Sequence, residues 1–230
     1  MARLIRFYKP YGVLSQFTTK DDRRTLADFI TVDGVYAAGR LDFDSEGLLL
    51  LTDDGRLQAR IADPRHRMEK IYLAQVLCET ADPEDAAHWS RVADALARGV
   101  VLRDGTSRAS RFERLVAEPA LPPRTPPVVA RHARSSVWVR IGLRSGRNRE
   151  VRRLLAAVGH PVLRLVRVRI GPFDLEGLTP GDWRAEEVGL PKAINPSRAM
   201  TPGARHRATS ARPSETRRRR APSSRRRRPS

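Results

Sequence analysis

The chain has 230 residues, and its 44 basic against 26 acidic side chains give a net charge of +18 at pH 7. Of the basic residues, 40 are arginines, whose planar guanidinium suits phosphate and stacked bases. We therefore expect nucleic acid rather than a membrane surface as partner. A codon bias toward arginine would give the same ratio of arginine to lysine. The single cysteine excludes an intramolecular disulfide, five scattered histidines give no zinc spacing, and no apolar run approaches the ~18 residues of a membrane span or the core of a signal peptide, so we expect a soluble, cytoplasmic protein.

Charge divides the chain into two parts. Residues 196–230 hold 12 arginines and one acid, Glu215, for +11, which leaves +7 for residues 1–195. This end consists mainly of Pro, Ser, Ala and Arg with almost nothing to bury, so we predict a disordered tail over residues 193–230. Its two RRRR blocks could act as a phosphate tether that ignores sequence, or the tail could be a solvated segment with no required role.

Residues 1–192 alternate short strand-like and helix-like stretches without a long repeat, which predicts a single α+β domain. Residues 47–52 (GLLLLT) are apolar enough for a central strand, and residues 56–62 can form a short helix that ends before Pro64. The segment Lys70–Leu77 (KIYLAQVL) is a further strand candidate.

A longer helix is predicted to begin at Asp82, with Pro83 in its first turn and an apolar stripe from Trp89 onward that Gly99 ends. A hairpin turn is then expected at residues 103–105, and a Pro-rich loop at residues 119–127. The alternation of SVWVRIGL over Ser136–Leu143 predicts a half-buried strand.

Three acids, Asp42, Asp44 and Glu46, lie in a loop that leads into the first of these strands. They match a calcium loop on paper, but the strand-like run at residues 48–51 occupies positions that such a loop needs for ligands. Two-carboxylate hydrolysis or magnesium-dependent phosphoryl chemistry would need acids that face one another, which this spacing does not guarantee. Solvated loop acids around a tight turn are the plain alternative.

The stretch RSGRNREVRRLLAAVGHP at residues 144–161 predicts a helix that Asn148 caps and that Gly159 ends. Arg152 lies at the edge of the apolar stripe and can reach inward, where it would need an acidic partner. Arg147, Arg149 and Arg153 stay free to meet phosphate or simply to form a solvated basic face.

Several motifs carry a family resemblance. They are GRLDFDSEGLLLLTDDG, EKIYLAQV and SGRNREVRRLLAAVGHPVLRLVRVRIG, joined by FYKPYGVLSQFT, LPPRTPP and GDWR. Together they resemble the pseudouridine synthases that act on ribosomal RNA (the RsuA family), most of all the large-subunit pseudouridine synthase E subgroup. The resemblance spans most of residues 3–184, and with KPYGVLSQFT beginning at residue 9 we expect no S4-like RNA-binding module.

The resemblance implies a mixed, mainly antiparallel sheet core of the pseudouridine synthase type with flanking helices. It also implies that the protein isomerises a uridine in ribosomal RNA, and more specifically in large-subunit RNA. We expect it to need no metal or other cofactor, to act as a monomer and not to bind membranes. A non-catalytic RNA-binding or assembly protein and a hydrolase that uses the acid cluster remain the competing hypotheses.

Residue by residue, the resemblance implies that Asp42 is the catalytic aspartate. Tyr72 corresponds to the tyrosine that packs on the target base and helps proton removal at C5, and Arg152 to the arginine paired with the catalytic carboxylate. Arg40 stands where relatives fill the gap left by a flipped nucleotide, and the remaining expected substrate contacts are Arg147, Asn148 and Arg149.

Two positions depart from the family pattern. Glu150 replaces the usual glutamine of GRNRQVRR, and Asp53 replaces an asparagine. Both lie beside the matched catalytic positions, so they put RNA contacts and local charge in doubt more than the chemistry. Whether Asp42 attacks the sugar at C1′ or the base at C6 stays open.

Overall fold

A computed structural model describes residues 1–66, 68–79, 82–129 and 136–189. The chain divides into two units at Pro191, and every described residue belongs to the first unit. The predicted tail and its boundary at residues 192 and 193 lie outside the described residues and stay predictions. None of the helices in the described ranges is long and apolar enough to cross a membrane.

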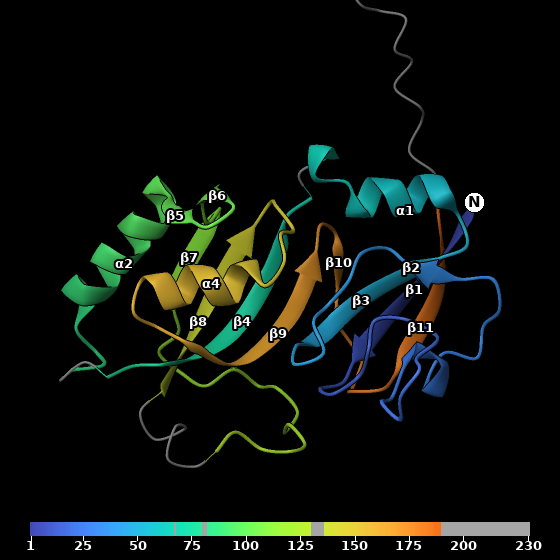
Figure 1. The fold of residues 1–230 in the computed structure, drawn as a ribbon, viewed down its shortest axis with the longest axis horizontal. Helices are drawn as coiled ribbons and strands as arrows, with labels where there is room; N and C mark the ends of the chain where they lie inside the picture. Colours follow the sequence, from blue (N-terminus) through green and yellow to red (C-terminus); the bar gives the residue numbers. More distant parts are fainter. Residues whose placement is uncertain (67, 80–81, 130–135, 190–230) are drawn as a thin grey trace, which may run out of the picture. The chain divides into compact units, whose positions relative to one another are not determined.

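The described part of the chain forms one large sheet of nine strands and a separate hairpin (Figure 1). Along the sheet the order is β11-β1-β3-β9-β4-β8-β7, with β10 paired to β9 and β2 to β3. All neighbours are antiparallel except β3 and β9. The strands are β1 (Ala2–Lys9), β2 (Tyr36–Ala37), β3 (Glu46–Thr52), β4 (Lys70–Leu77), β7 (Arg111–Arg114), β8 (Ser136–Leu143), β9 (Val162–Ile170), β10 (Phe173–Asp174) and β11 (Trp183–Val188), with β5 (Val100–Leu102) and β6 (Gly105–Ser107) in the hairpin.

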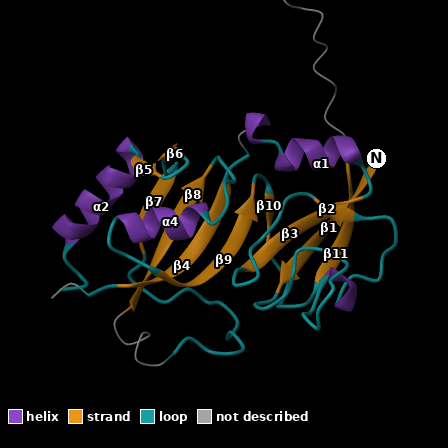
Figure 2. Cartoon of the chain, in the orientation of Figure 1, coloured by secondary structure: helices purple, strands orange, loops and turns teal. Residues whose placement is uncertain are grey.

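Within the described ranges three α-helices flank the sheet (Figure 2), which confirms the predicted mixed, mainly antiparallel α+β fold. Helices α2 (Ala86–Arg98) and α4 (Glu150–Ala157) lie beside β4, β8 and β7, whereas α1 (Gly55–Ala62) lies by β3. Two short 3₁₀ helices, Leu26–Asp28 and Pro64–His66, complete the described elements.

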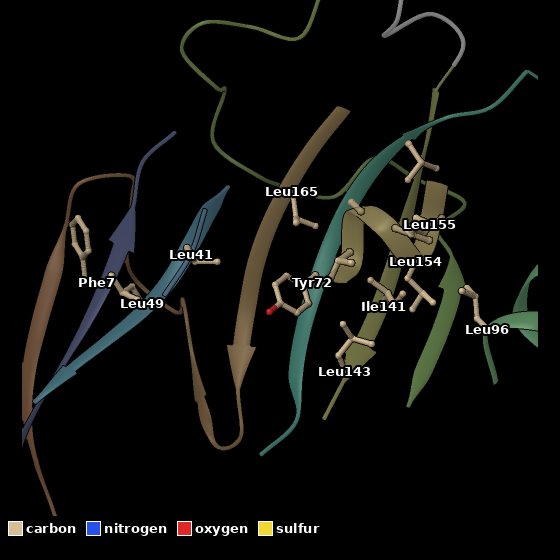
Figure 3. Packing of buried hydrophobic residues seen from close by; sticks show 14 of the residues in the cluster. Phe7, Leu41, Leu49, Tyr72, Leu96, Ile141, Leu143, Leu154, Leu155 and Leu165 are labelled. Atoms are coloured by element: carbon tan, nitrogen blue, oxygen red, sulfur yellow. The ribbon is translucent and has the colours of Figure 1, made fainter. Parts of the chain in front are cut away.

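The apolar run of β3 is buried on both faces, as predicted for a central strand. Leu49 and Leu51 belong to the larger core cluster, which Figure 3 shows with Leu154 and Leu155 of α4. Residues 48 and 50 instead join a second cluster with the apolar residues of α1. Because successive side chains of a strand point to opposite faces, an uninterrupted leucine run is what such a strand requires.

Along the strand order β11-β1-β3-β9-β4-β8-β7, backbone pairing is shortest where β3 meets β9. Only two residue pairs join these strands, Glu46 with Val166 and Gly47 with Arg167. A Cβ on residue 47 would lie 2.3 Å from the Arg167 carbonyl oxygen, and its φ is +103°, so only glycine allows this approach. Side chains of β9 reinforce the junction, because the buried Arg164 pairs with the buried Glu46 through two hydrogen bonds of 2.9 Å.

Two predicted helix starts are wrong. Helix α2 begins at Ala86 with Asp85 as its cap, because the Asp85 carboxylate accepts from the backbone N–H groups of residues 87 and 88, while Asp82 accepts from Glu84 in a preceding turn. Asn148 does not cap α4. Its N-cap is Arg149 in the left-handed region at φ 47°, without a side-chain capping bond.

Candidate active site

A cleft of about 610 Å³ opens beside the junction of β3 and β9. The loop before β3, the start of β4, the loop from β8 into α4, and β9 supply its walls. This volume falls within the ~300–1,000 Å³ of typical small-ligand sites. Of the seven predicted site residues, six line the cleft: Arg40, Asp42, Tyr72, Arg147, Asn148 and Arg149.

Asp42 lies in a loop whose backbone is tied down on both sides. The Ser15 hydroxyl donates to the Leu41 carbonyl at 2.8 Å and accepts from the Leu41 N–H at 3.1 Å. The Gly12 N–H donates to the Phe43 carbonyl at 2.9 Å, and the Ser45 N–H to the Asp42 carbonyl at 3.1 Å. The carboxylate itself is about one-third exposed and accepts no hydrogen bond from the described residues, and its one ion pair among them is a long one of 3.9 Å to Arg149.

The arginines of α4 engage Asp44 rather than Asp42. Arg149 donates to both Asp44 carboxylate oxygens at 2.9 and 3.0 Å, whereas its nearest approach to Asp42 is 3.9 Å. Arg152 donates to the Asp44 carbonyl at 2.7 Å and lies 3.4 Å from an Asp44 carboxylate oxygen. The ion pair of Arg152 is therefore with Asp44 and not with Asp42 as the resemblance implies, and Arg152 is not among the residues that line the cleft.

Electrostatics follow this arrangement. Partial burial alone would raise the pKa of Asp44, but the hydrogen bonds from Arg149 and the charge of Arg152 outweigh it and lower that pKa. Burial lowers the pKa of the Arg152 guanidinium, and Asp44 partly opposes that shift. Asp44 therefore stays ionised and pairs with both Arg149 and Arg152. The Asp42 carboxylate is left facing the cleft.

Tyr72 lies on β4 and is 9% exposed. Its backbone partners are Ile141 of β8 and Arg167 of β9. Figure 3 shows its ring between β9 and β4, near the labelled Leu165. A flat aromatic wall in the same cleft as an open carboxylate is suited to holding a planar base against a nucleophile.

The remaining predicted contacts lie at the cleft rim. Arg40 and Asn148 are exposed. Arg147 donates to the Gly105 carbonyl at 3.0 Å, which ties the rim to the turn of the β5–β6 hairpin predicted at residues 103–105. Phe43 was not predicted as a site residue, although it follows Asp42 directly. This residue is 39% exposed and lines the same cleft.

Glu150, the departure from the family pattern, is buried and fully engaged. It accepts from the Ser107 hydroxyl at 2.7 Å, the Ser145 hydroxyl at 2.9 Å and the Arg147 N–H at 3.1 Å. A carboxylate at this position therefore fastens the β6 strand and the loop before α4 to one another. The shape of the cleft wall follows from these three bonds.

Sequence reasoning missed two further cations in the cleft wall, Lys70 and Arg167, which are 8% and 5% exposed. The signal for Lys70 was present, because residues 70 and 72 of one strand share a face. Among the described residues no group of three or more His, Cys, Asp or Glu side chains could hold a metal ion. The calcium-loop reading fails, because Glu46 opens a buried strand and pairs with Arg164.

The sequence and the structure were compared with those of known proteins to find the family to which the chain belongs. A family model described as RNA pseudouridylate synthase matches residues 3–157. A protein of Xanthomonas campestris pv. campestris named ribosomal large subunit pseudouridine synthase E is 48% identical over 85% of this chain and 100% of its own length. One of the same name from Vibrio vulnificus is 46% identical over 82% of this chain and 76% of its own length.

More distant relatives agree. Ribosomal small subunit pseudouridine synthase A of Salmonella typhimurium is 37% identical over 79% of this chain and 69% of its own length. A crystal structure of a pseudouridylate synthase superposes with a TM-score of 0.61 at 29% identity, covering 81% of this chain and 71% of that one. The chain therefore belongs to the RNA pseudouridylate synthase family. It is an isomerase that converts uridine in RNA to pseudouridine, and the fold type expected from the sequence is confirmed.

Proposed function

We propose that this enzyme isomerises a specific uridine of large-subunit ribosomal RNA, with Asp42 as the nucleophile and the target nucleotide flipped into the cleft. The names of the relatives from Xanthomonas campestris and Vibrio vulnificus support the substrate. The observation that carries the mechanism is the open Asp42 carboxylate in one cleft with Tyr72, while Asp44 takes up the neighbouring arginines. A cytoplasmic location and a monomeric state remain predictions.

The reaction breaks one bond and forms another within the same nucleotide. In the sugar route, an Asp42 oxygen attacks C1′, and the C1′–N1 bond breaks with its electron pair left on uracil. The freed ring turns, C5 attacks C1′, and the carboxylate leaves with the electron pair of its own bond. C5 then loses its proton and N1 gains one, so uridine and pseudouridine have the same atoms.

In the base route, the Asp42 oxygen adds to C6 and the electron pair of the C5–C6 double bond moves toward O4. The C1′–N1 bond then breaks, the ring turns about its bond to Asp42, and C5 bonds to C1′. Loss of the C5 proton re-forms the C5–C6 double bond and expels the carboxylate from C6, while N1 gains a proton. Either route needs only a carboxylate, a dry pocket and a place for one proton. Tyr72, beside the base, would assist removal of the C5 proton. The loop bonds of Ser15 and Gly12 hold Asp42 still enough for in-line attack.

Flipping the nucleotide costs a few kcal/mol of stacking. Exposed groups at the rim can offset this cost. The Arg40 guanidinium can occupy the gap in the RNA stack, and the exposed Phe43 ring offers a surface for a neighbouring base. Positive charge from Arg147 at the same rim would hold the phosphates on either side.

The test is pseudouridine mapping on unmodified ribosomal RNA of both subunits, by reverse-transcription stops at carbodiimide adducts. Wild type should create one new stop in large-subunit RNA. Asp42→Asn should create none, while its RNA affinity stays within about threefold, since a carboxamide keeps the shape but is no nucleophile. A new stop that Asp42→Asn makes equally well would overturn the assignment of Asp42, and a stop confined to small-subunit RNA would overturn the proposed substrate.

A further inference from the structure

Lys70 is a mostly buried lysine of the cleft wall whose ammonium has no counterion among the described residues. It is 8% exposed, and among the described residues its side chain makes neither a hydrogen bond nor an ion pair. An unpaired charge on a side chain this little exposed to water is costly, and a bound group that accepts from the ammonium would offset that cost. A ligand that binds beside Lys70 would therefore need a negative charge or an acceptor oxygen, because the described residues provide neither to this ammonium.

The nearest acid cannot serve as the partner. Glu150 influences Lys70 electrostatically, but no Glu150 oxygen lies within ion-pair distance, and its oxygens are taken by two hydroxyls and a backbone N–H. Arg167 adds a second cation, 5% exposed, whose Nη2 has no hydrogen-bond partner. Burial lowers the pKa of Lys70, and the charge of Arg167 lowers it further. The inner cleft is consequently electropositive.

Lys70 also lies where the target base must go. It precedes Tyr72 by two residues on β4, so both side chains emerge on one face of the strand, and both line the cleft that holds Asp42. Its backbone partner on β9 is Ile170, and that of Tyr72 is Arg167. A base stacked on Tyr72 would therefore turn an edge toward the ammonium.

We propose that Lys70 is a catalytic residue of this isomerase and donates a hydrogen bond to a uracil carbonyl oxygen on which negative charge develops. This inference rests on the proposed function and goes further than it. After attack at C1′, the pair from the broken C1′–N1 bond delocalises over N1, O2 and O4. After addition at C6, the displaced pair resides on O4. Both routes place the charge on ring oxygens, so the role of Lys70 does not depend on which one operates.

An ammonium fixed in a nearly dry wall stabilises such a charge far more than water does, because it needs no reorganisation during the reaction. The proton stays on Lys70 throughout, and no other reactant is consumed. Arg167 is less suited to the same task, since Nε donates to the Leu48 carbonyl at 2.8 Å, Nη1 donates to the Arg40 carbonyl at 3.4 Å, and the unpartnered Nη2 is enclosed by protein atoms. It raises the local potential instead.

The test compares Lys70→Met with wild type in single-turnover experiments at saturating enzyme on RNA that contains the mapped uridine. Removing one preorganised donor typically costs about 10²–10³ in rate, and we expect a loss of that size with an RNA dissociation constant within about threefold of wild type. Lys20→Met is the matched control, because Lys20 is exposed and lies outside the cleft lining, and its rate should be unchanged. A larger effect of Lys70→Met on affinity than on rate would overturn the proposal in favour of a phosphate contact.

Two further measurements exclude simple misfolding. Lys70→Cys treated with 2-bromoethylamine regenerates an amine of nearly the same length, and most of the lost rate should return; wild type treated in parallel accounts for Cys78. RNA with 5-fluorouridine at the target carries a ring that stabilises negative charge by itself but has no C5 proton to lose, so the rate compared on the two substrates is consumption of the target nucleotide by cleavage of its C1′–N1 bond. Lys70→Met should lose less of this rate on 5-fluorouridine than on uridine. Equal losses on both substrates, or no rescue by the amine, would overturn the role of Lys70.

The outcomes also separate this inference from the function beneath it. Product formation that Asp42→Asn abolishes and Lys70→Met leaves intact refutes Lys70 alone. Product formation that survives in Asp42→Asn refutes the proposed mechanism and the inference together.

Discussion

Asp44 explains why Asp42 remains open. Two acids two residues apart share one loop, yet Arg149 donates two hydrogen bonds to Asp44 and only approaches Asp42 at 3.9 Å. Arg152 adds its bond to the Asp44 backbone. The acid nearer the strand therefore pairs with the helix arginines and fixes the loop, while the acid before it, the proposed nucleophile, faces the cleft.

Replacing Asp44 with Asn should slow isomerisation about 10- to 100-fold, since a charge-assisted hydrogen bond contributes about 1.5–3 kcal/mol, and should change RNA affinity little. Single-turnover rates measure the effect. Asp104→Asn is the matched control, because Asp104 accepts a comparable pair of bonds from Arg153 on the same helix but lies outside the cleft lining. Equal losses in the two variants would show that general helix anchoring, not the loop of Asp42, is responsible.

At the level of elements, the junction of β3 and β9 joins the two parts of the sheet on either side of the cleft. Its backbone contribution is two residue pairs, so side chains do much of the joining. Arg164 donates to both Glu46 oxygens and also to the Pro122 carbonyl at 2.7 Å, which attaches the Pro-rich loop to the same point. Stability and active-site geometry are coupled here, because Glu46 follows the loop of Asp42.

Removing one partner of this pair leaves an uncompensated buried charge, so Arg164→Met should lower the free energy of unfolding by about 3–5 kcal/mol. Glu46→Gln should cost a similar amount. The double variant should lose clearly less than the two losses added together, which urea unfolding of all four proteins can measure. Additive losses would mean that the two side chains contribute separately to stability.

Much of this fold could be predicted from periodicity and turn residues. The strands Lys70–Leu77 and Ser136–Leu143 are confirmed with the predicted bounds, because two-residue alternation or apolar continuity is strong in both. The two helix starts were predicted wrongly because several neighbouring polar residues could each cap the helix. Asp82 and Asp85 both suit that role, and tertiary packing decides between them.

The site could be predicted only in part. Six of seven residues meet in one cleft because motifs fix them by similarity. The choice of Arg149 and Arg152 for Asp44 depends on how α4 approaches the loop, which spacing along the chain does not determine. The burial of Lys70 without an acid is likewise a property of three strands packed together, not of the KIY sequence alone.

For the whole molecule, the distribution of charge predicts different roles for the domain and the tail: the domain carries out the reaction and the tail binds RNA. The cleft lies in the first unit, whereas +11 of the total +18 lies in residues 196–230, which are outside the described residues. Every residue of the proposed mechanism lies in the first unit, so we expect the chemistry to proceed without the tail. Affinity for RNA is the property that the tail is expected to supply.

Deleting residues 196–230 should weaken RNA binding and flatten its dependence on salt, because the slope of log affinity against log salt shrinks by roughly 0.7–0.9 for every phosphate that the protein no longer neutralises. The single-turnover rate on bound RNA should not change. A full-length variant with both RRRR blocks replaced by glutamine keeps the length and should behave like the deletion. An unchanged slope in either variant would reject a phosphate tether.

The most direct test of the central claim is the release of tritium from C5 of uridine in labelled ribosomal RNA, since isomerisation is complete only when that hydrogen leaves. We predict release by wild type in an amount equal to the pseudouridine formed, slower release by Asp44→Asn, and none by Asp42→Asn. Release by Asp42→Asn at the wild-type rate would contradict the account, because the open carboxylate in the cleft would then not be the nucleophile.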